Sequence, residues 1–260
     1  MSRAGGGPPG RVVGRSWVDA VRVSGGDAFV RWHVHPAAVR EVRCGTAGGG
    51  TWWSLRVGAM SYWEDGALLV AGDPDAVAAV AGPLRRATAA PDLTVPAAAA
   101  VAAGGASGLG LDPDRTFGWA WQHATRPLPP VRGEEQVAWD PPGSDVARLL
   151  DEASPHAFVR PGHPWARRWA GVRGDDGRLL ACGAVTEHVP GVPHLAAVAT
   201  RPAVRGRGLA GAVTAAMTRS LLRRAPAVTL ALWASNDAAR RTYARIGFRP
   251  AHDFVGGPPA

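Results

Sequence analysis

The segment VRGRGLAG, residues 204–211, places the strongest single constraint on the fold of this chain. Its glycines, Gly206, Gly208 and Gly211, have the spacing G-x-G-x-x-G and lie between a strand-like run and a long helical pattern. Glycines at such a junction let backbone N–H groups turn toward an anion, and the unpaired donors and the dipole of the helix start stabilise its charge. The sequence therefore predicts a phosphate-binding helix N-terminus in a domain of mixed α and β structure.

Two familiar phosphate-binding loops do not fit this segment. A dinucleotide-binding turn needs a strand that runs directly into the first glycine and an acidic residue about twenty positions later. Here RPAVR (201–205) separates the strand from Gly206, and the only acid near the next strand, Asp237, opens a helix. A Walker-type loop needs a lysine, and all 29 basic residues of this chain are arginines.

Two motifs together resemble the GNAT acyltransferase superfamily. VATRPAVRGRGLAG (198–211) resembles its acyl-CoA loop, Q/R-x-x-G-x-G/A after a strand, with Arg205, Gly208 and Ala210 at the motif positions. NDAARRTYARIGF (236–248) is similar to its second landmark, N-x-x-A-x-x-x-Y-x-x-x-G-F. The resemblance covers about residues 134–255 and is best over 192–250.

The resemblance implies a mixed sheet with two splayed strands, flanked by helices. We expect a smaller N-terminal α+β module to precede this domain, so the expected fold class is α+β. It also implies acetyl-CoA as co-substrate, with its acetyl group transferred to a primary amine of a small molecule or a protein. Backbone groups of 198–200 are then expected to pair with the pantetheine amides, the loop N–H groups to hold the pyrophosphate, and Asn236 and Ala239 to flank the arm. The expected cofactor-binding residues are Val198, Ala199, Thr200, Arg205, Gly206, Arg207, Gly208, Leu209, Ala210, Asn236 and Ala239.

The resemblance assigns Tyr243 a place near the thioester sulfur, where a phenol can donate a proton to the departing thiolate. The alternative is a core aromatic, because Tyr243 shares a helical face with Ala239 and Ile246.

The general base is less clear from the sequence. Many members of the superfamily carry a glutamate four residues before the position of Thr200, and this chain has Ala196 there. Glu187 and His194 are the candidate substitutes, with His188 between them, and a proton relay through water is the alternative.

The chain is expected to divide into a module over 1–130 and a GNAT-like domain over 134–260, joined by the proline-rich linker RPLPPVRG (126–133). The first half has one R-x-x-G-x-A match, RTFGWA (115–120), but it lies at the strand predicted for 117–122 and does not lead from a strand into a helix. We therefore expect this half to bind no cofactor; a degenerate copy of the same fold is one alternative for it. Its predicted elements are strands at 27–34, 51–57, 66–72 and 117–122 and a helix at 73–87, with 91–111 irregular. The second half is predicted to contain strands at 135–139, 165–173, 178–189, 192–200 and 227–234. Its predicted helices lie at 144–153, from the glycine loop to about 224, and at 237–246. Ser144 is expected to cap the first of them, and Asn236 and Gly247 to cap and end the last.

Composition limits the partners and the compartment. The net charge of +8 would attract a polyanion, but the arginines occur in pairs rather than in long blocks, which disfavours nucleic acid as a partner. Two cysteines are too few for a disulfide framework or a zinc site, and the first 14 residues lack the apolar core of a signal peptide, so we expect a cytoplasmic protein without a membrane span.

His33 and His35 could begin a metal site only with a third ligand, which the sequence does not indicate, so no metal is expected. The rival function is a non-catalytic module that senses acyl-CoA or binds nucleic acid.

Overall fold

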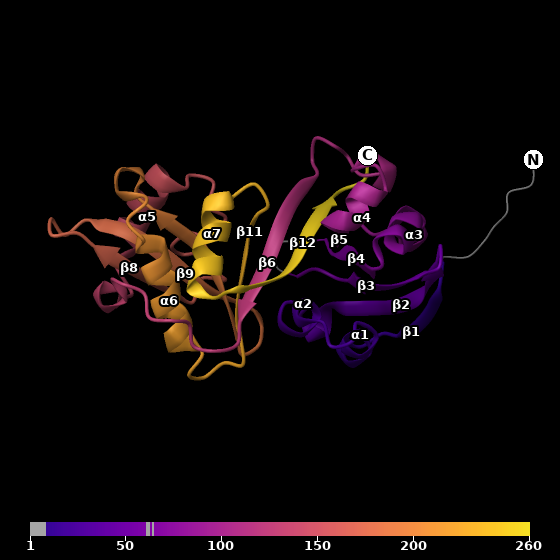
Figure 1. The fold of residues 1–260 in the computed structure, drawn as a ribbon, viewed down its shortest axis with the longest axis horizontal. Helices are drawn as coiled ribbons and strands as arrows, with labels where there is room; N and C mark the ends of the chain where they lie inside the picture. Colours follow the sequence, from indigo (N-terminus) through magenta and orange to yellow (C-terminus); the bar gives the residue numbers. More distant parts are fainter. Residues whose placement is uncertain (1–8, 61–62, 64) are drawn as a thin grey trace, which may run out of the picture. The chain divides into compact units, whose positions relative to one another are not determined.

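The computed structural model describes residues 9–60, 63 and 65–260, which form two compact units (Figure 1). The first unit contains the chain up to Ala120, together with Trp233–Ser235 and His252–Ala260. The second contains Trp121–Leu232 and Asn236–Ala251. The expected linker, 126–133, contains neither helix nor strand. None of the helices in the described part of the chain has the length and apolar character that a membrane span requires.

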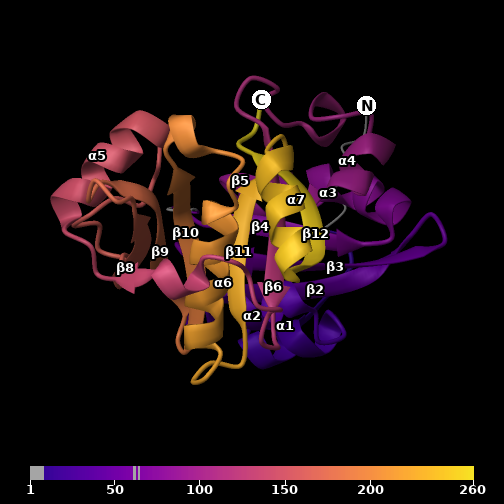
Figure 2. The same cartoon turned by 60° about the vertical axis from the view of Figure 1, so that its left-hand side comes forward.

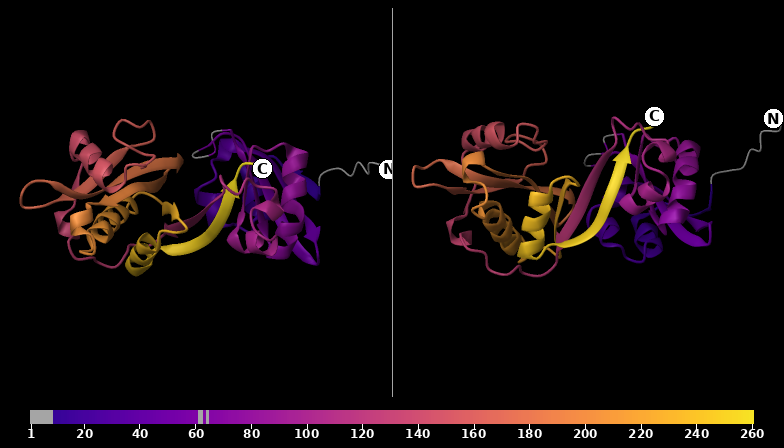
Figure 3. Two further views of the ribbon diagram at one scale, coloured as in Figure 1. Left: turned by 90° about the horizontal axis from the view of Figure 1, so that it is seen from above. Right: turned by 45° about the horizontal axis from the view of Figure 1, so that its top comes forward.

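The first unit is a sheet in the order β1-β2-β3-β4-β5-β12, with β6 next to β12. Its strands are β1 (Arg11–Gly14), β2 (Val39–Ala47), β3 (Gly50–Val57), β4 (Ala67–Gly72) and β5 (Asp92–Pro96), with parts of β6 (Phe117–Ala124) and β12 (Arg249–Gly257). Residues 117–120 of β6 and 252–257 of β12 belong to this unit, and the rest of both strands belongs to the second. Its helices are α1 (Trp17–Val23), α2 (Ala28–Trp32), α3 (Pro74–Thr88) and α4 (Ala97–Ala102), with 3₁₀ turns η1 (Pro36–Ala38) and η2 (Ser107–Leu109). Helices α3 and α4 cover the opposite face of this sheet from α1 and α2 (Figures 1 and 3).

The strand predicted at 27–34 is wrong, because this segment forms helix α2. The carboxylate of Asp27 accepts hydrogen bonds from the N–H groups of Phe29 and Val30, at 2.9 and 3.1 Å, and so starts a helix in a run of residues with strand propensity. His33 and His35 therefore do not share a strand face: His33 follows α2 and stacks on Phe29, while His35 caps η1. Within the described residues, no group of three or more His, Cys, Asp or Glu side chains could hold a metal ion.

The segment predicted to be irregular, 91–111, contains β5, α4 and η2. Strand β5 pairs with β4 in parallel and with β12 antiparallel, so one of its two partners lies about 160 residues away in the sequence. A local sequence pattern therefore cannot indicate that β5 pairs with β12. Strand β2 was not predicted either.

The second unit is a sheet in the order β11-β10-β9-β8-β7, with β6 next to β11. Figure 2 shows β8 to β11 in this order. Its strands are β7 (Ala138–Trp139), β8 (Arg168–Arg173), β9 (Leu179–Val189), β10 (Val192–Thr200) and β11 (Val228–Trp233). Its helices are α5 (Gly143–Ala153), α6 (Leu209–Leu221) and α7 (Asp237–Ile246), with 3₁₀ turns η3 (Glu134–Gln136) and η4 (Pro202–Val204). Helix α5 covers one face of the sheet, and α6 and α7 cover the other (Figure 3).

The predicted elements of this unit all occur, but several ends differ. Helix α5 is capped by Pro142 rather than by Ser144, which lies inside the first turn. Strand β7 has only two residues because η3 takes up its expected start, and α6 ends at Leu221. Helix α7 has the predicted bounds, with Asn236 as its N-cap and Gly247 in the left-handed conformation, φ 102°, at its end.

The two units share one order of elements. In each, a short strand and one or two helices precede three antiparallel strands, and a helix then leads to a strand that pairs in parallel with the last of the three. That helix is α3 in the first unit and α6 in the second.

Candidate functional site

Strands β10 and β11 separate along their length. They pair in parallel at His194↔Thr229 and Leu195↔Leu230, and no register pair follows, although both strands continue. On its other side, β10 stays paired with β9 as far as Thr200↔Ala181. The end of β10 therefore presents backbone groups, on the side toward β11, that no strand of the sheet takes up.

A β-bulge in β10 accompanies this separation. Ala197 has φ 48°, and the register with β9 shifts between Ala196 and Ala199, so that two residues oppose Gly183 alone. A bulge bends the strand and increases its twist, which accounts for the divergence from β11. The nearby thiol of Cys182 is buried, and burial raises its pKa to about 12, so it is no nucleophile at neutral pH.

The loop after β10 leads into the N-terminus of α6 through two left-handed glycines. Gly206 has φ 80° and Gly208, the N-cap of the helix, has φ 82°. A Cβ atom at either position would meet nothing within 4 Å, so glycine is needed there for backbone conformation rather than for room. Among the described residues no side chain caps α6, and the carbonyl of its N-cap, Gly208, accepts the hydrogen bond that the N–H of Ala212 donates, at 3.0 Å. The donors of the first turn are thus oriented toward the exposed loop.

Arg205 holds this loop in place. Its guanidinium donates to the carbonyl of Thr200 at 3.2 Å and to that of Ala153, at the end of α5, at 3.1 Å. Its backbone N–H donates to the carbonyl of Pro202, so it is used inside the loop and is not part of the donor set expected from the sequence. Arg207 is exposed.

Two polar side chains lie at the ends of the separated strands. The Thr200 hydroxyl is buried and has no hydrogen-bond partner among the residues that the structure describes. Asn236, after β11, accepts the N–H of Ala239 at 3.0 Å through its side-chain oxygen, so its amide N–H₂ is the group left for a ligand.

Tyr243 lies on the buried face of α7. It is 7% exposed, its ring is 6.0 Å from that of Phe248, and Ile246 is buried on the same face. Burial raises the pKa of its phenol to about 12, so the hydroxyl stays protonated over the whole physiological range. This state suits a proton donor and a packed aromatic equally well.

The two base candidates lie on opposite faces of the sheet. His194 pairs with Thr186, and adjacent residues of a strand alternate between faces, so Glu187 points away from the face that carries His194. Glu187 is exposed and accepts the N–H of Gly191 at 3.1 Å, which closes the turn between β9 and β10. It lines a cavity of about 410 Å³ beside the C-terminal end of α6, the end opposite the glycine loop. The sequence candidates are thus not brought together.

His194 belongs to a row of rings on the face that carries α5. It is buried, and its Nδ1 lies 2.9 Å from the Thr229 hydroxyl. Its ring centroid is 4.5 Å from that of His188, which in turn is 5.8 Å from that of Trp165. Burial lowers the pKa of His188 to about 4.

The row continues to the surface through the segment between α5 and β8. Trp165 lies 5.5 Å from Phe158 and 5.3 Å from His163, measured between ring centroids, and Phe158 is 47% exposed. The sequence pattern predicted Trp165 as the start of a strand over 165–173, which begins at Arg168 instead, and gave no role to Phe158 or His163. The signal was present in the concentration of rings within PHAFVRPGHPW (155–165), a stretch whose prolines and glycine exclude regular structure.

The FR47-like protein family model matches residues 172–254. A GNAT-family protein from Novosphingobium aromaticivorans has 19% identity and a TM-score of 0.50, covering 92% of this chain and 96% of its own. A GCN5-related N-acetyltransferase from Kribbella flavida has 19% identity and a TM-score of 0.50, covering 95% of this chain and 97% of its own. This chain has the GNAT fold.

The resemblance stated from the two motifs is therefore confirmed, and so is the expected mixed sheet flanked by helices. The GNAT match spans nearly the whole chain, not only residues 134–255. Among curated proteins, none is detectably similar in sequence.

Proposed function

We propose that this protein is an acetyl-CoA-dependent N-acetyltransferase that acts on a primary amine. The observation that carries the proposal is the separation of β10 from β11 next to the uncapped, glycine-led start of α6. An extended chain with amide groups would pair with the strand edge, and a diphosphate would accept hydrogen bonds from the helix start.

The residues at this site fit an acyl-CoA substrate. The buried Thr200 hydroxyl lacks a partner that an amide of the pantetheine arm would supply. The loop offers the N–H groups of 206–210 and the exposed guanidinium of Arg207, and Arg205 fixes the loop to β10 and α5. Val198, Ala199, Asn236 and Ala239 would line the arm.

The chemistry requires two proton transfers. The amine nitrogen attacks the thioester carbon, a C–N bond forms and the C–S bond breaks, so the amine loses a proton and the thiolate gains one. We assign the second transfer to the Tyr243 phenol, which stays protonated at neutral pH. The protein would contribute orientation and a site from which water is excluded.

For the base, we favour His194 over Glu187. His194 lies on the face of β10 that also carries Ala196, the position of the usual glutamate, and two residues from it. With the proton of Nδ1 donated to Thr229, Nε2 is the basic nitrogen. Glu187 is held in a turn on the other face of the sheet. The acceptor would enter along the row of Phe158, Trp165 and His188.

We infer that the first unit is a degenerate copy of the same fold without a cofactor site. Its equivalent of α6 is α3, which begins one residue after β4 and has no glycine loop. Its N-cap, Asp73, accepts the N–H and hydroxyl of Thr51 and places a carboxylate where the second unit would hold a pyrophosphate. A carboxylate at this helix start would repel a second anion.

The test is the shift in melting temperature given by acetyl-CoA, NAD and single-stranded DNA in parallel. At a hundred times its Kd, a ligand adds about 2.7 kcal/mol to the free energy of unfolding, which is on the order of 5–10 °C for a chain of this size. We expect acetyl-CoA to give this shift, and NAD and single-stranded DNA to give none. A shift with NAD and none with acetyl-CoA would overturn the proposal, and a shift with DNA alone would favour a nucleic-acid-binding module.

A further inference from the structure

A second charged cavity lies in the second unit, at the turn between β8 and β9. It has a volume of about 380 Å³, and Arg201, the residue after β10, closes one side of it. The charged residues that line it are Asp145, Arg148, Arg173, Asp176, Arg178 and Arg201. The lining thus has two positive charges in excess, and nothing in the proposed transfer reaction uses them.

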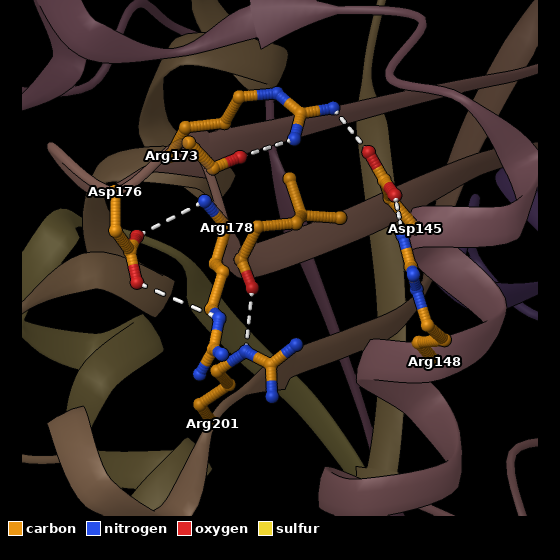
Figure 4. A network of polar contacts seen from close by, with 8 residues as sticks. Asp145, Arg148, Arg173, Asp176, Arg178 and Arg201 are labelled. Carbon is orange, nitrogen blue, oxygen red and sulfur yellow. Dashed lines mark hydrogen bonds and ion pairs between the residues drawn. The ribbon is translucent and has the colours of Figure 1, made fainter.

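The arginines are held in position by their partners (Figure 4). Asp145 lies between Arg173 and Arg148 and pairs with both, and the hydrogen bond from Arg173 keeps the pKa of this carboxyl below its usual range. Arg173 also donates to the carbonyl of Gly177 at 2.6 Å. Arg201 donates to the carbonyl of Leu179 at 2.8 Å and pairs with Glu152, which lies outside the lining.

These contacts leave donors for a ligand. A guanidinium carries five N–H groups, while Arg148 uses one nitrogen in the network and Arg178 reaches Asp176 only at 3.6 Å. Exposed ion pairs of this kind add little to the free energy of unfolding, so stability alone gives no reason for four arginines to meet here. A phosphate monoester carries close to two negative charges and three acceptor oxygens, which match the excess charge and the donors left over.

We propose that this cavity binds a phosphate monoester. Two sources have this chemistry. One is the ribose 3′-phosphate of the acyl-CoA, since Arg201 directly follows Thr200, and Arg205 of the glycine loop contacts both Thr200 and the end of α5. The other is a free phosphorylated ligand. The first source rests on the proposed function, whereas the site itself does not.

The variant that tests the site is Arg178→Gln. This side chain is 75% exposed and has only the long contact to Asp176, so its loss should leave the fold intact. The matched control is Arg223→Gln, which removes the same charge from an exposed arginine near the far end of α6 that contacts Ser220. The first arm titrates inorganic phosphate by calorimetry. We expect Arg178→Gln to weaken the binding at least fivefold and Arg223→Gln to leave it within twofold; phosphate bound at the glycine loop would respond to neither.

The second arm compares CoA with dephospho-CoA, which lacks the 3′-phosphate. If the cofactor is the source, CoA binds at least fivefold tighter in the wild type and in Arg223→Gln, and the difference disappears in Arg178→Gln. Phosphate binding sensitive to Arg178, with equal affinities for the two cofactors, supports the site and identifies a free ligand as its source. If neither cofactor binds but the phosphate arm succeeds, the proposed function fails and the site stands. The site is overturned if phosphate binding does not depend on Arg178 and the two cofactors bind with equal affinity. It is also overturned if Arg223→Gln weakens phosphate binding as much as Arg178→Gln does.

Discussion

Tyr243 combines a buried ring with a hydroxyl that burial keeps protonated. It is either the general acid or a packing residue, and only the first role needs the hydroxyl oxygen. As general acid, it should contribute about 100- to 10,000-fold to turnover. We therefore expect Tyr243→Phe to lower kcat at least tenfold, because the thiolate loses its proton donor, and to leave the affinity for acetyl-CoA within about threefold. Steady-state kinetics with an amine substrate and calorimetry with acetyl-CoA measure the two effects. Normal turnover of the Phe variant would show that Tyr243 is a packing residue and that the acid is elsewhere.

His188 makes the stability of the second unit depend on pH. Its pKa is near 6.5 in an unfolded chain and is lowered to about 4 by burial in the folded one, so the unfolded chain binds more protons between these values. The stabilisation is complete above about pH 6.5 and is lost as the pH falls toward 4, by up to about 3 kcal/mol. We expect His188→Phe, which keeps a ring against Trp165 and His194, to flatten this part of the stability curve.

The control for His188 is His156→Phe, at an exposed position in the same unit. Denaturation midpoints measured from pH 4 to 8 compare the three proteins. If wild type and His188→Phe lose stability in parallel on acidification, another group titrates.

At the level of elements, the glycine loop and α7 show what a local sequence can determine. Both were placed correctly because their signals are local: left-handed glycines at a helix start, a side-chain cap at Asn236, and a stop at Gly247. Strand β5 was missed because it depends on a distant partner, β12. Helix α2 was missed for a different reason: its cap, the Asp27 carboxylate, is a local signal, but the residues that follow it have strand propensity. The row of rings from Phe158 to His194 was missed because it joins three segments, of which only 155–165 shows a local concentration of rings.

Gly208→Val tests the loop as an element. Its side chain would project into the open space beside the first turn of α6, where the pyrophosphate is proposed to lie, so we expect it to abolish the melting shift given by acetyl-CoA. The matched control is Gly49→Val in the turn between β2 and β3. Gly49 has φ 84°, against 82° for Gly208, and equally open surroundings, so both variants place a valine in the left-handed region of φ without a steric clash at Cβ. An acetyl-CoA shift that survives in Gly208→Val, or that disappears in both variants, would contradict the assignment.

At the level of the whole molecule, most of the last strand of the chain, from His252 onward, belongs to the first unit. Residues 254–257 of β12 pair with β5, and His252 bonds to Asp27 at 2.7 Å. A fragment of residues 134–260, the domain bounds expected from the sequence, would therefore carry a strand whose partner has been removed, and an unpaired strand edge favours aggregation. The boundary of the second unit at Ala251 is the better place to end such a fragment.

The contribution of this last strand to the free energy of unfolding of the first unit can be measured in the full chain with Phe254→Ala. Phe254 is 1% exposed, and its ring lies 5.0 Å from that of Phe29 and 4.7 Å from that of Trp119. Removing a buried ring of this kind costs about 3–5 kcal/mol, because the cavity closes only in part. Phe117→Ala, at a ring that is 42% exposed, is the control and should cost much less. We expect chemical denaturation to show an earlier transition only in Phe254→Ala, while acetyl-CoA still shifts the unfolding of the second unit. Equal transitions in the two variants would mean that the C-terminal strand contributes little to holding the first unit together.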